Sequence, residues 1–153
     1  MTVPYLPRLD LLLLGADEFG SALDVAMEFD QISETVERTT PDDHVRFAPK
    51  QRRRTKLAEL PQLLCEHPPH LLHISGDAND AGELVFAGET VDPRQLATTI
   101  LHAVSGLRCV VLNVCNGEQL AACLSEHVDV VISMRGVVED NAARVFALSL
   151  IHI

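Results

Sequence analysis

The chain has 153 residues, of which 47% are hydrophobic, and a formal net charge of −10. This length fits a single domain over 1–153 with a sizeable buried core, and the acidic balance argues against nucleic-acid partners or anionic membranes. The N-terminus lacks a signal-peptide pattern, and the apolar run 11–14 is too short to cross a bilayer. We therefore expect a cytoplasmic protein with no membrane partner.

The four cysteines do not form a disulfide framework or a zinc motif. They stand at positions 65, 109, 115 and 123, without a Cys-x-x-Cys pair. We expect no metal and no cofactor. Cys65, Cys109 and Cys123 are interpreted as small apolar side chains of the core, whereas Cys115 has a different setting.

Strand-like runs alternate with helix-like segments along the whole sequence. Strands are predicted at 9–14, 45–48, 70–75, 108–113 and 128–134, with a small hairpin over 83–91. Helices are predicted at 21–38, 57–66, 92–104 and 118–127, and from 139 onward. This alternation predicts an α/β fold, a three-layer sandwich with a mainly parallel central sheet. The basic run 50–56 is interpreted as a solvated loop and helix start.

Reactive side chains follow several of the predicted strands. In a parallel sheet, ligands and catalytic groups collect beyond the carboxyl ends of the strands. Cys115 comes directly after an apolar strand and lies at the start of a predicted helix, whose unpaired N–H groups favour a thiolate. The same edge is expected to hold the following residues: Asp17, Glu18, Asp77 and Arg135.

Four blocks of the sequence resemble the CHAT family, relatives of caspases in the caspase–hemoglobinase superfamily. They are Leu-Leu-His-Ile-Ser-Gly at 71–76, Gly-Glu-Leu-Val-Phe at 82–86, Val-Val-Leu-Asn-Val-Cys at 110–115, and the segment 130–147. The blocks occur in the order and at the spacing of the family. The resemblance covers about residues 9–150 and implies a caspase-like sandwich with a Cys–His dyad peptidase site.

Carried over residue by residue, the resemblance places the family nucleophile on Cys115 and the family histidine on Asp77. Ala78 replaces the glycine that follows this histidine. Asp17, Glu18 and Arg135 correspond to a substrate pocket, where acidic side chains would bind a basic P1 residue. The resemblance therefore implies a retained nucleophile and a missing base.

The substitution of Asp for His changes the expected chemistry. In a Cys–His dyad the imidazole removes the thiol proton and later protonates the leaving amine, which requires a pKa near 7. An aspartate titrates near 4 and is a poor acid for the second step. Its charge also disfavours a neighbouring thiolate.

No other histidine is a convincing replacement. His73 lies four residues before Asp77, about 13 Å along an extended strand, and is interpreted as a buried, hydrogen-bonded core residue. Asp77, Asn79 and Asp80 lack the ligand spacing of a calcium loop and indicate turn chemistry.

Three functions follow from these observations. The first is a degenerate CHAT domain that acts as a regulatory or protein-interaction module in bacterial signalling or defence, with protein or peptide partners. The second is an active cysteine endopeptidase that uses Cys115 with a non-standard base. The third is a receiver-like phosphoacceptor in which Asp17, Glu18 and Asp77 gather Mg²⁺, with Arg135 where such chemistry needs a lysine. Because the sequence stops within a helical pattern, we expect a truncated C-terminus and further modules of a longer polypeptide.

Overall fold

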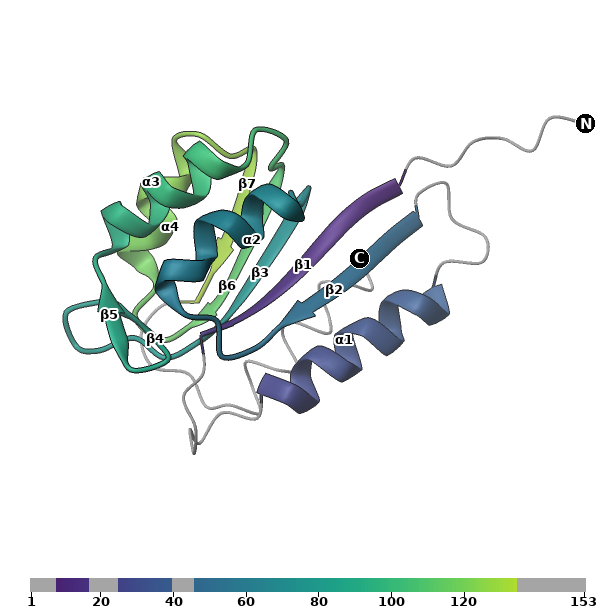
Figure 1. The fold of residues 1–153 in the computed structure, drawn as a ribbon, viewed down its shortest axis with the longest axis horizontal. Helices are drawn as coiled ribbons and strands as arrows, with labels where there is room; N and C mark the ends of the chain where they lie inside the picture. The colour runs from purple at the N-terminus through teal and green to yellow at the C-terminus, as the bar shows by residue number, and fades with distance from the viewer. Residues whose placement is uncertain (1–7, 17–24, 40–45, 135–153) are drawn as a thin grey trace, which may run out of the picture.

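The computed structural model describes residues 8–16, 25–39 and 46–134. Five strands form one sheet in the order β2-β1-β3-β6-β7, and every neighbouring pair is parallel (Figure 1). The strands are β1 (Arg8–Ala16), β2 (Arg46–Arg52), β3 (Leu71–Gly76), β6 (Cys109–Val114) and β7 (Val130–Ser133). The α/β class and the parallel sheet predicted from the sequence are confirmed.

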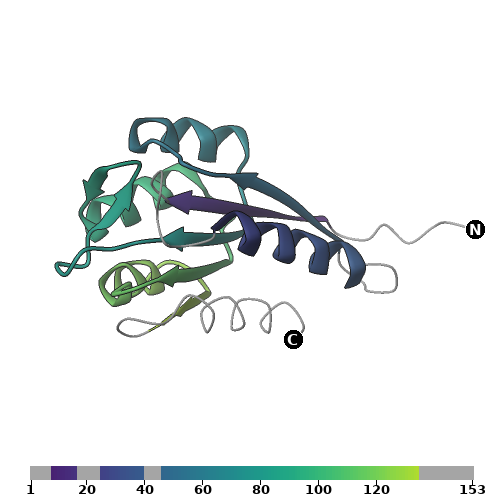
Figure 2. The same cartoon turned by 90° about the horizontal axis from the view of Figure 1, so that it is seen from below.

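Helices cover both faces of this sheet. They are α1 (Val25–Thr39), α2 (Leu60–Glu66) with a preceding 3-10 turn η1 (Leu57–Glu59), α3 (Pro93–Ala103) and α4 (Glu118–Ser125). Figure 2 shows α1 and α2 on opposite sides of β1 and β2. The arrangement is the expected three-layer sandwich.

Alternation along the strands divides the core between the two faces, because successive side chains of a strand point to opposite sides. The larger apolar cluster joins one face to α2, α3 and α4 through residues that include Leu12, Leu14, Leu72, Ile74, Val110, Leu112, Leu64, Leu96, Ile100 and Leu120. The smaller cluster joins Leu11 and Leu13 of β1 to α1 through Val25, Phe29, Ile32 and Val36. Leu11–Leu14 of β1 is therefore a continuous apolar run, as expected for a strand covered on both sides.

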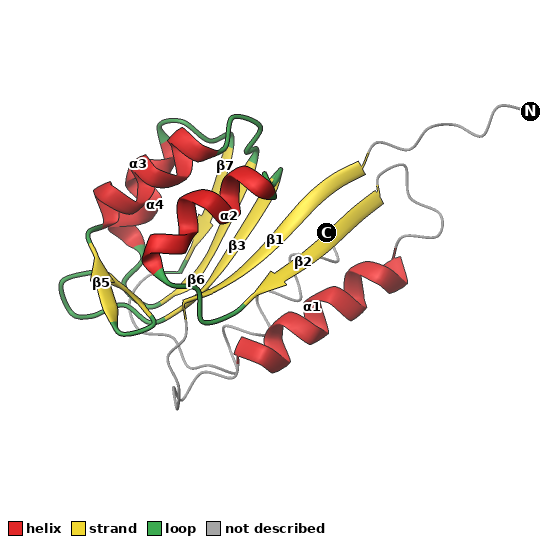
Figure 3. Cartoon of the chain, viewed as in Figure 1, coloured by secondary structure: helices red, strands yellow, loops and turns green. Residues whose placement is uncertain are grey.

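A two-stranded hairpin interrupts the βα alternation after β3. It consists of β4 (Leu84–Phe86) and β5 (Glu89–Val91), joined by Ala87 and Gly88, both at positive φ. β4 contacts β1 and β3, so the hairpin lies where the central strands end (Figure 3). The hairpin predicted over 83–91 is confirmed.

Local signals in the sequence set the ends of α3 and α2. The Asp92 side chain accepts hydrogen bonds from the backbone N–H groups of Arg94 and Gln95, and Pro93 occupies the first helical position. Pro61 lies in the first turn of α2, where no intrahelical donor is lost.

Two predictions were wrong. The basic run 50–56 does not begin as a loop, because Lys50, Gln51 and Arg52 extend β2 and pair with β1. β2 lies at the edge of the sheet, where charged side chains remain solvated and the strand needs no apolar alternation. Cys65 is exposed rather than part of the core, because α2 buries Leu60 and Leu64 and the next position turns away.

Candidate functional site at the strand ends

The register of β3 and β6 brings two predicted site residues to neighbouring strand ends. Gly76 pairs with Val114, so Asp77 and Cys115 directly follow the ends of two adjacent parallel strands. Asp77 is exposed and Cys115 is half-buried. The sheet thus brings the proposed nucleophile position and the proposed base position to one edge.

The loops that carry these residues also meet each other. Gly82, in the loop after β3, has a φ of +77°, and a Cβ atom built on it would lie 3.4 Å from the carbonyl oxygen of Asn116. Asn116 itself has a φ of 56°. Cys115 is therefore separated from the first residue of α4 by a tight turn rather than lying in the helix.

Hydrogen bonds within the loop after β3 confirm the turn chemistry predicted there. The Asn79 side-chain oxygen accepts from the backbone N–H groups of Ala81 and Glu83 at 3.1 and 3.0 Å, and its amide donates to the Glu83 carboxylate at 2.8 Å. The carbonyl of Asp77 accepts from the N–H of Val85 at 3.0 Å. The Asn79 side chain thus stabilises the loop through hydrogen bonds to other residues of the same loop.

Beneath this edge, a carboxylate lies in the core with three polar partners. Glu28, in the first turn of α1, contacts His73 Nε2 at 2.6 Å and accepts hydrogen bonds from Ser75 Oγ at 2.8 Å and Asn113 Nδ2 at 3.0 Å. The four residues are only 3, 5, 1 and 7% exposed, in the order Glu28, His73, Ser75 and Asn113. We call these four residues the Glu28 network.

The hydrogen bonds of the Glu28 network stabilise the ionised form of the Glu28 carboxylate. Burial by itself would raise the Glu28 pKa, but the hydrogen bond and charge of His73, with the hydrogen bonds from Ser75 and Asn113, together lower the pKa below 4.5. Because the ionised carboxylate has no proton to give, His73 Nε2–H donates in this pair. The edge of the Phe29 ring packs against the imidazole, with ring centroids 6.1 Å apart.

The prediction that His73 is a buried, hydrogen-bonded strand residue is confirmed. The sequence analysis missed its partners Glu28, Ser75 and Asn113. One signal was present: Glu28 falls between Val25 and Ile32 on the face of α1 that is otherwise apolar. A carboxylate on a buried helix face requires polar partners opposite it.

The remaining described histidines lie toward the amino-terminal edge of the sheet. His70 Nδ1 accepts from the backbone N–H of Asp10 at 3.0 Å, and His67 Nδ1 lies 2.8 Å from Lys50 Nζ. A cavity of about 160 Å³ beside them is lined by residues that include Asp10, Lys50, Glu66 and His67. His102 and His127 lie at or just after the ends of α3 and α4, which lead back to the starts of β6 and β7.

Three of the predicted site residues lie outside the described residues, namely Asp17, Glu18 and Arg135. In the described ranges, no group of three or more His, Cys, Asp and Glu side chains could hold a metal ion. Along the same ranges, no helix combines the length and the apolar character needed to cross a membrane.

No protein-family model matches the chain, and no curated protein matches it.

Proposed function

We propose that this chain is a degenerate caspase-like domain of the CHAT type, which keeps the nucleophile Cys115 and carries Asp77 in place of the histidine. Its role is that of a regulatory or protein-interaction module with protein or peptide partners. The observation that carries the proposal is the register of β3 and β6, which brings Asp77 and Cys115 to adjacent strand ends. In this proposal, the carboxylate of Asp77 takes the place of the imidazole of a Cys–His dyad.

The chemistry of an aspartate supports an inactive site. A carboxylate is a poor general acid for protonating a leaving amine at neutral pH. His73, the histidine closest in sequence, donates its Nε2–H to Glu28 inside the core, four residues before Asp77.

The decisive experiment restores the base. We expect the wild-type protein to leave fluorogenic peptides with a basic P1 residue uncleaved, and the Asp77→His variant to gain hydrolysis that Cys115→Ala abolishes. A positioned general base contributes about 10²–10⁴-fold to a rate, so a gain within this range is measurable. Asp80→His is the matched control, because it places an imidazole on an exposed position of the same loop.

Two outcomes contradict the proposal. Cys115-dependent turnover by the wild-type protein would establish the second function, an active cysteine endopeptidase with a non-standard base. An inactive Asp77→His variant that is correctly folded would argue that Asp77 does not occupy the position of a base.

A phosphoacceptor remains a second candidate because of the strand order. The sequence of neighbours β2-β1-β3-β6-β7 is also that of flavodoxin-like sheets, in which ligands bind where the strand order reverses, beside β1 and β3. Asp77 follows β3 at this place. Incubation with acetyl phosphate and Mg²⁺ tests it, since a phosphoacceptor gains the mass of one phosphoryl group and the Asp77→Asn variant does not.

A further inference from the structure

The Glu28 network spans the two strands that carry the proposed site. Ser75 and Asn113 are register partners on β3 and β6, and both donate to the same carboxylate. Asp77 and Cys115 follow them by two residues each. One side chain of α1 is therefore hydrogen-bonded to the last residues of both strands that lead to the site.

The apolar contacts of α1 involve other parts of the sheet than the hydrogen bonds of Glu28. The apolar cluster on this face joins α1 to Leu11, Leu13 and the partly buried Leu71. Gln51 of β2 adds hydrogen bonds to the carbonyl of Phe29 at 3.2 Å and to Ser33 Oγ at 2.9 Å. The apolar packing of α1 thus lies over β1 and the start of β3, and Glu28 is its polar link to the end of β3 and to β6.

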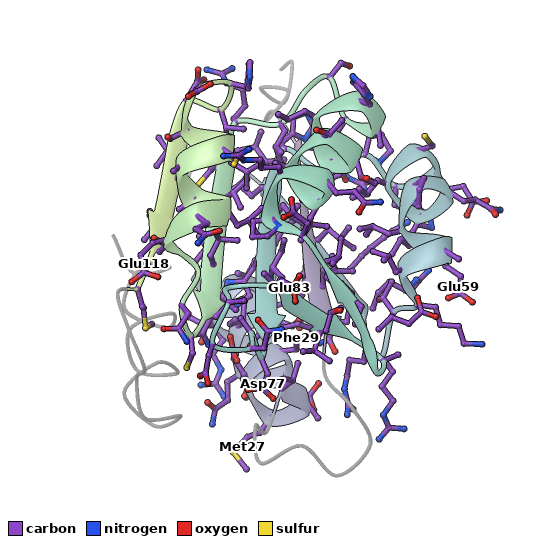
Figure 4. The ribbon with its side chains drawn as sticks, turned by 90° about the vertical axis from the view of Figure 1, so that its left-hand side faces the viewer. Met27, Phe29, Glu59, Asp77, Glu83 and Glu118 are labelled. Atoms are coloured by element: carbon purple, nitrogen blue, oxygen red, sulfur yellow. The ribbon has the colours of Figure 1, made fainter. Side chains whose placement is uncertain are left out.

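In the projection of Figure 4, Asp77 is labelled between Met27 and Phe29 of α1. The hydrogen bond between Ser75 and Glu28, at 2.8 Å, places this turn against the end of β3. A displacement of this first turn would break the hydrogen bonds to Ser75 and Asn113, which precede Asp77 and Cys115 by two residues.

We propose that Glu28 is a positioning residue that couples α1 to the separation and exposure of Asp77 and Cys115, so that loss of its hydrogen bonds to Ser75 and Asn113 alters the reactivity of Cys115. The inference rests on the proposed function, in which these two residues form the site. Breaking the network leaves a buried carboxylate without partners, which is strongly unfavourable.

The test measures alkylation of each cysteine by iodoacetamide in the native protein, with peptide mass spectrometry. Cys65 is exposed and serves as the reference thiol in the same molecule. In Glu28→Ala we expect the rate at Cys115 relative to Cys65 to rise about fivefold or more, the lower range of allosteric coupling. Glu28→Gln keeps an acceptor for Ser75 and should fall between this variant and the wild type.

Controls separate positioning from loss of stability. Glu34→Ala removes an exposed carboxylate from the same helix and should leave the ratio unchanged. Cys109 and Cys123, both half-buried, report global opening. If their rates rise together with that of Cys115, or if the ratio in both Glu28→Ala and Glu28→Gln equals that of the wild type, the inference is wrong.

Failure here and failure of the proposed function are distinguishable. The alkylation ratio does not depend on catalysis, whereas the proposed function is decided by peptide hydrolysis with Asp77→His and Cys115→Ala. Should Glu28→Ala not fold, Glu28→Gln and Ser75→Ala each remove a part of the network and give the same comparison. An unchanged ratio in both would overturn the coupling.

Discussion

Replacing Glu28 by alanine removes the acceptor shared by three buried donors. His73, Ser75 and Asn113 each lose a hydrogen bond to the carboxylate, and leaving a buried polar group unsatisfied costs about 1–3 kcal/mol. Since three donors lose their acceptor at once, we expect Glu28→Ala to lower the free energy of unfolding by at least about 3 kcal/mol.

Urea denaturation followed by circular dichroism measures this change. With a slope of about 1–3 kcal/mol per molar urea for a domain of this size, the midpoint should fall by about 2 M. Glu28→Gln retains an acceptor and should cost less, about 1–3 kcal/mol. The matched control is Glu34→Ala, which breaks an exposed pair with Arg38 and should change stability by less than about 1 kcal/mol.

A double-mutant cycle tests whether the three bonds form one unit. Glu28→Ala and Ser75→Ala share a partner, so their effects should not add, and the interaction energy should lie at about 0.5–3 kcal/mol. The reasoning is refuted if Glu28→Ala lies within about 1 kcal/mol of the wild type with an unchanged slope. Such a result would mean that the carboxylate contributes no net stability in its buried position.

Three further predictions concern pH, packing and capping. The Glu28 pKa is lower in the folded state than its ordinary value of 4.5. The ionised carboxylate therefore contributes its full stabilisation above that value, and this contribution is lost as the pH falls through the folded pKa. Unfolding free energies measured across this acidic range should fall more steeply for the wild type than for Glu28→Gln. Gly76→Ala places a Cβ atom 2.8 Å from the Cβ of Ala16 and should cost about 1–3 kcal/mol in urea denaturation, whereas Gly106→Ala, where nothing lies within 4 Å, should cost no more than about 0.5 kcal/mol. Asp92→Ala removes the N-cap of α3 and should lower the thermal unfolding midpoint by the equivalent of about 1 kcal/mol, with Asp92→Asn close to the wild type.

The sheet was predictable because its central strands are buried on both faces. β1 contains the continuous apolar run Leu11–Leu14, and such a short run is typical of a strand covered on both faces. The extension of β2 through Lys50 to Arg52 was not predictable, since an edge strand carries no hydrophobic pattern. Cys65 was assigned to the core from its residue type, while its exposure is set by the helical phase of Leu60 and Leu64.

The candidate site was predictable in part. Cys115 and Asp77 could be assigned to the same edge because parallel strands end together, and the register of Gly76 with Val114 agrees with this. The Glu28 network was not predictable, since its bonds connect residues on three elements and no local pattern specifies which partners meet. His73 was correctly expected to be buried, but only the fold identifies Glu28 as the group that satisfies it.

The sequence separations within the Glu28 network have a consequence for how the chain acquires its structure. Glu28 is 45 and 47 positions from His73 and Ser75, and 85 positions from Asn113. During synthesis, α1 therefore leaves the ribosome long before its last hydrogen-bonding partner exists. Contacts between residues this far apart in the sequence form slowly, because the intervening chain must first close into a loop. Because its apolar partners on β1 precede it in the chain, we expect α1 to dock early, and the Glu28 network to be completed only after β6 has been added.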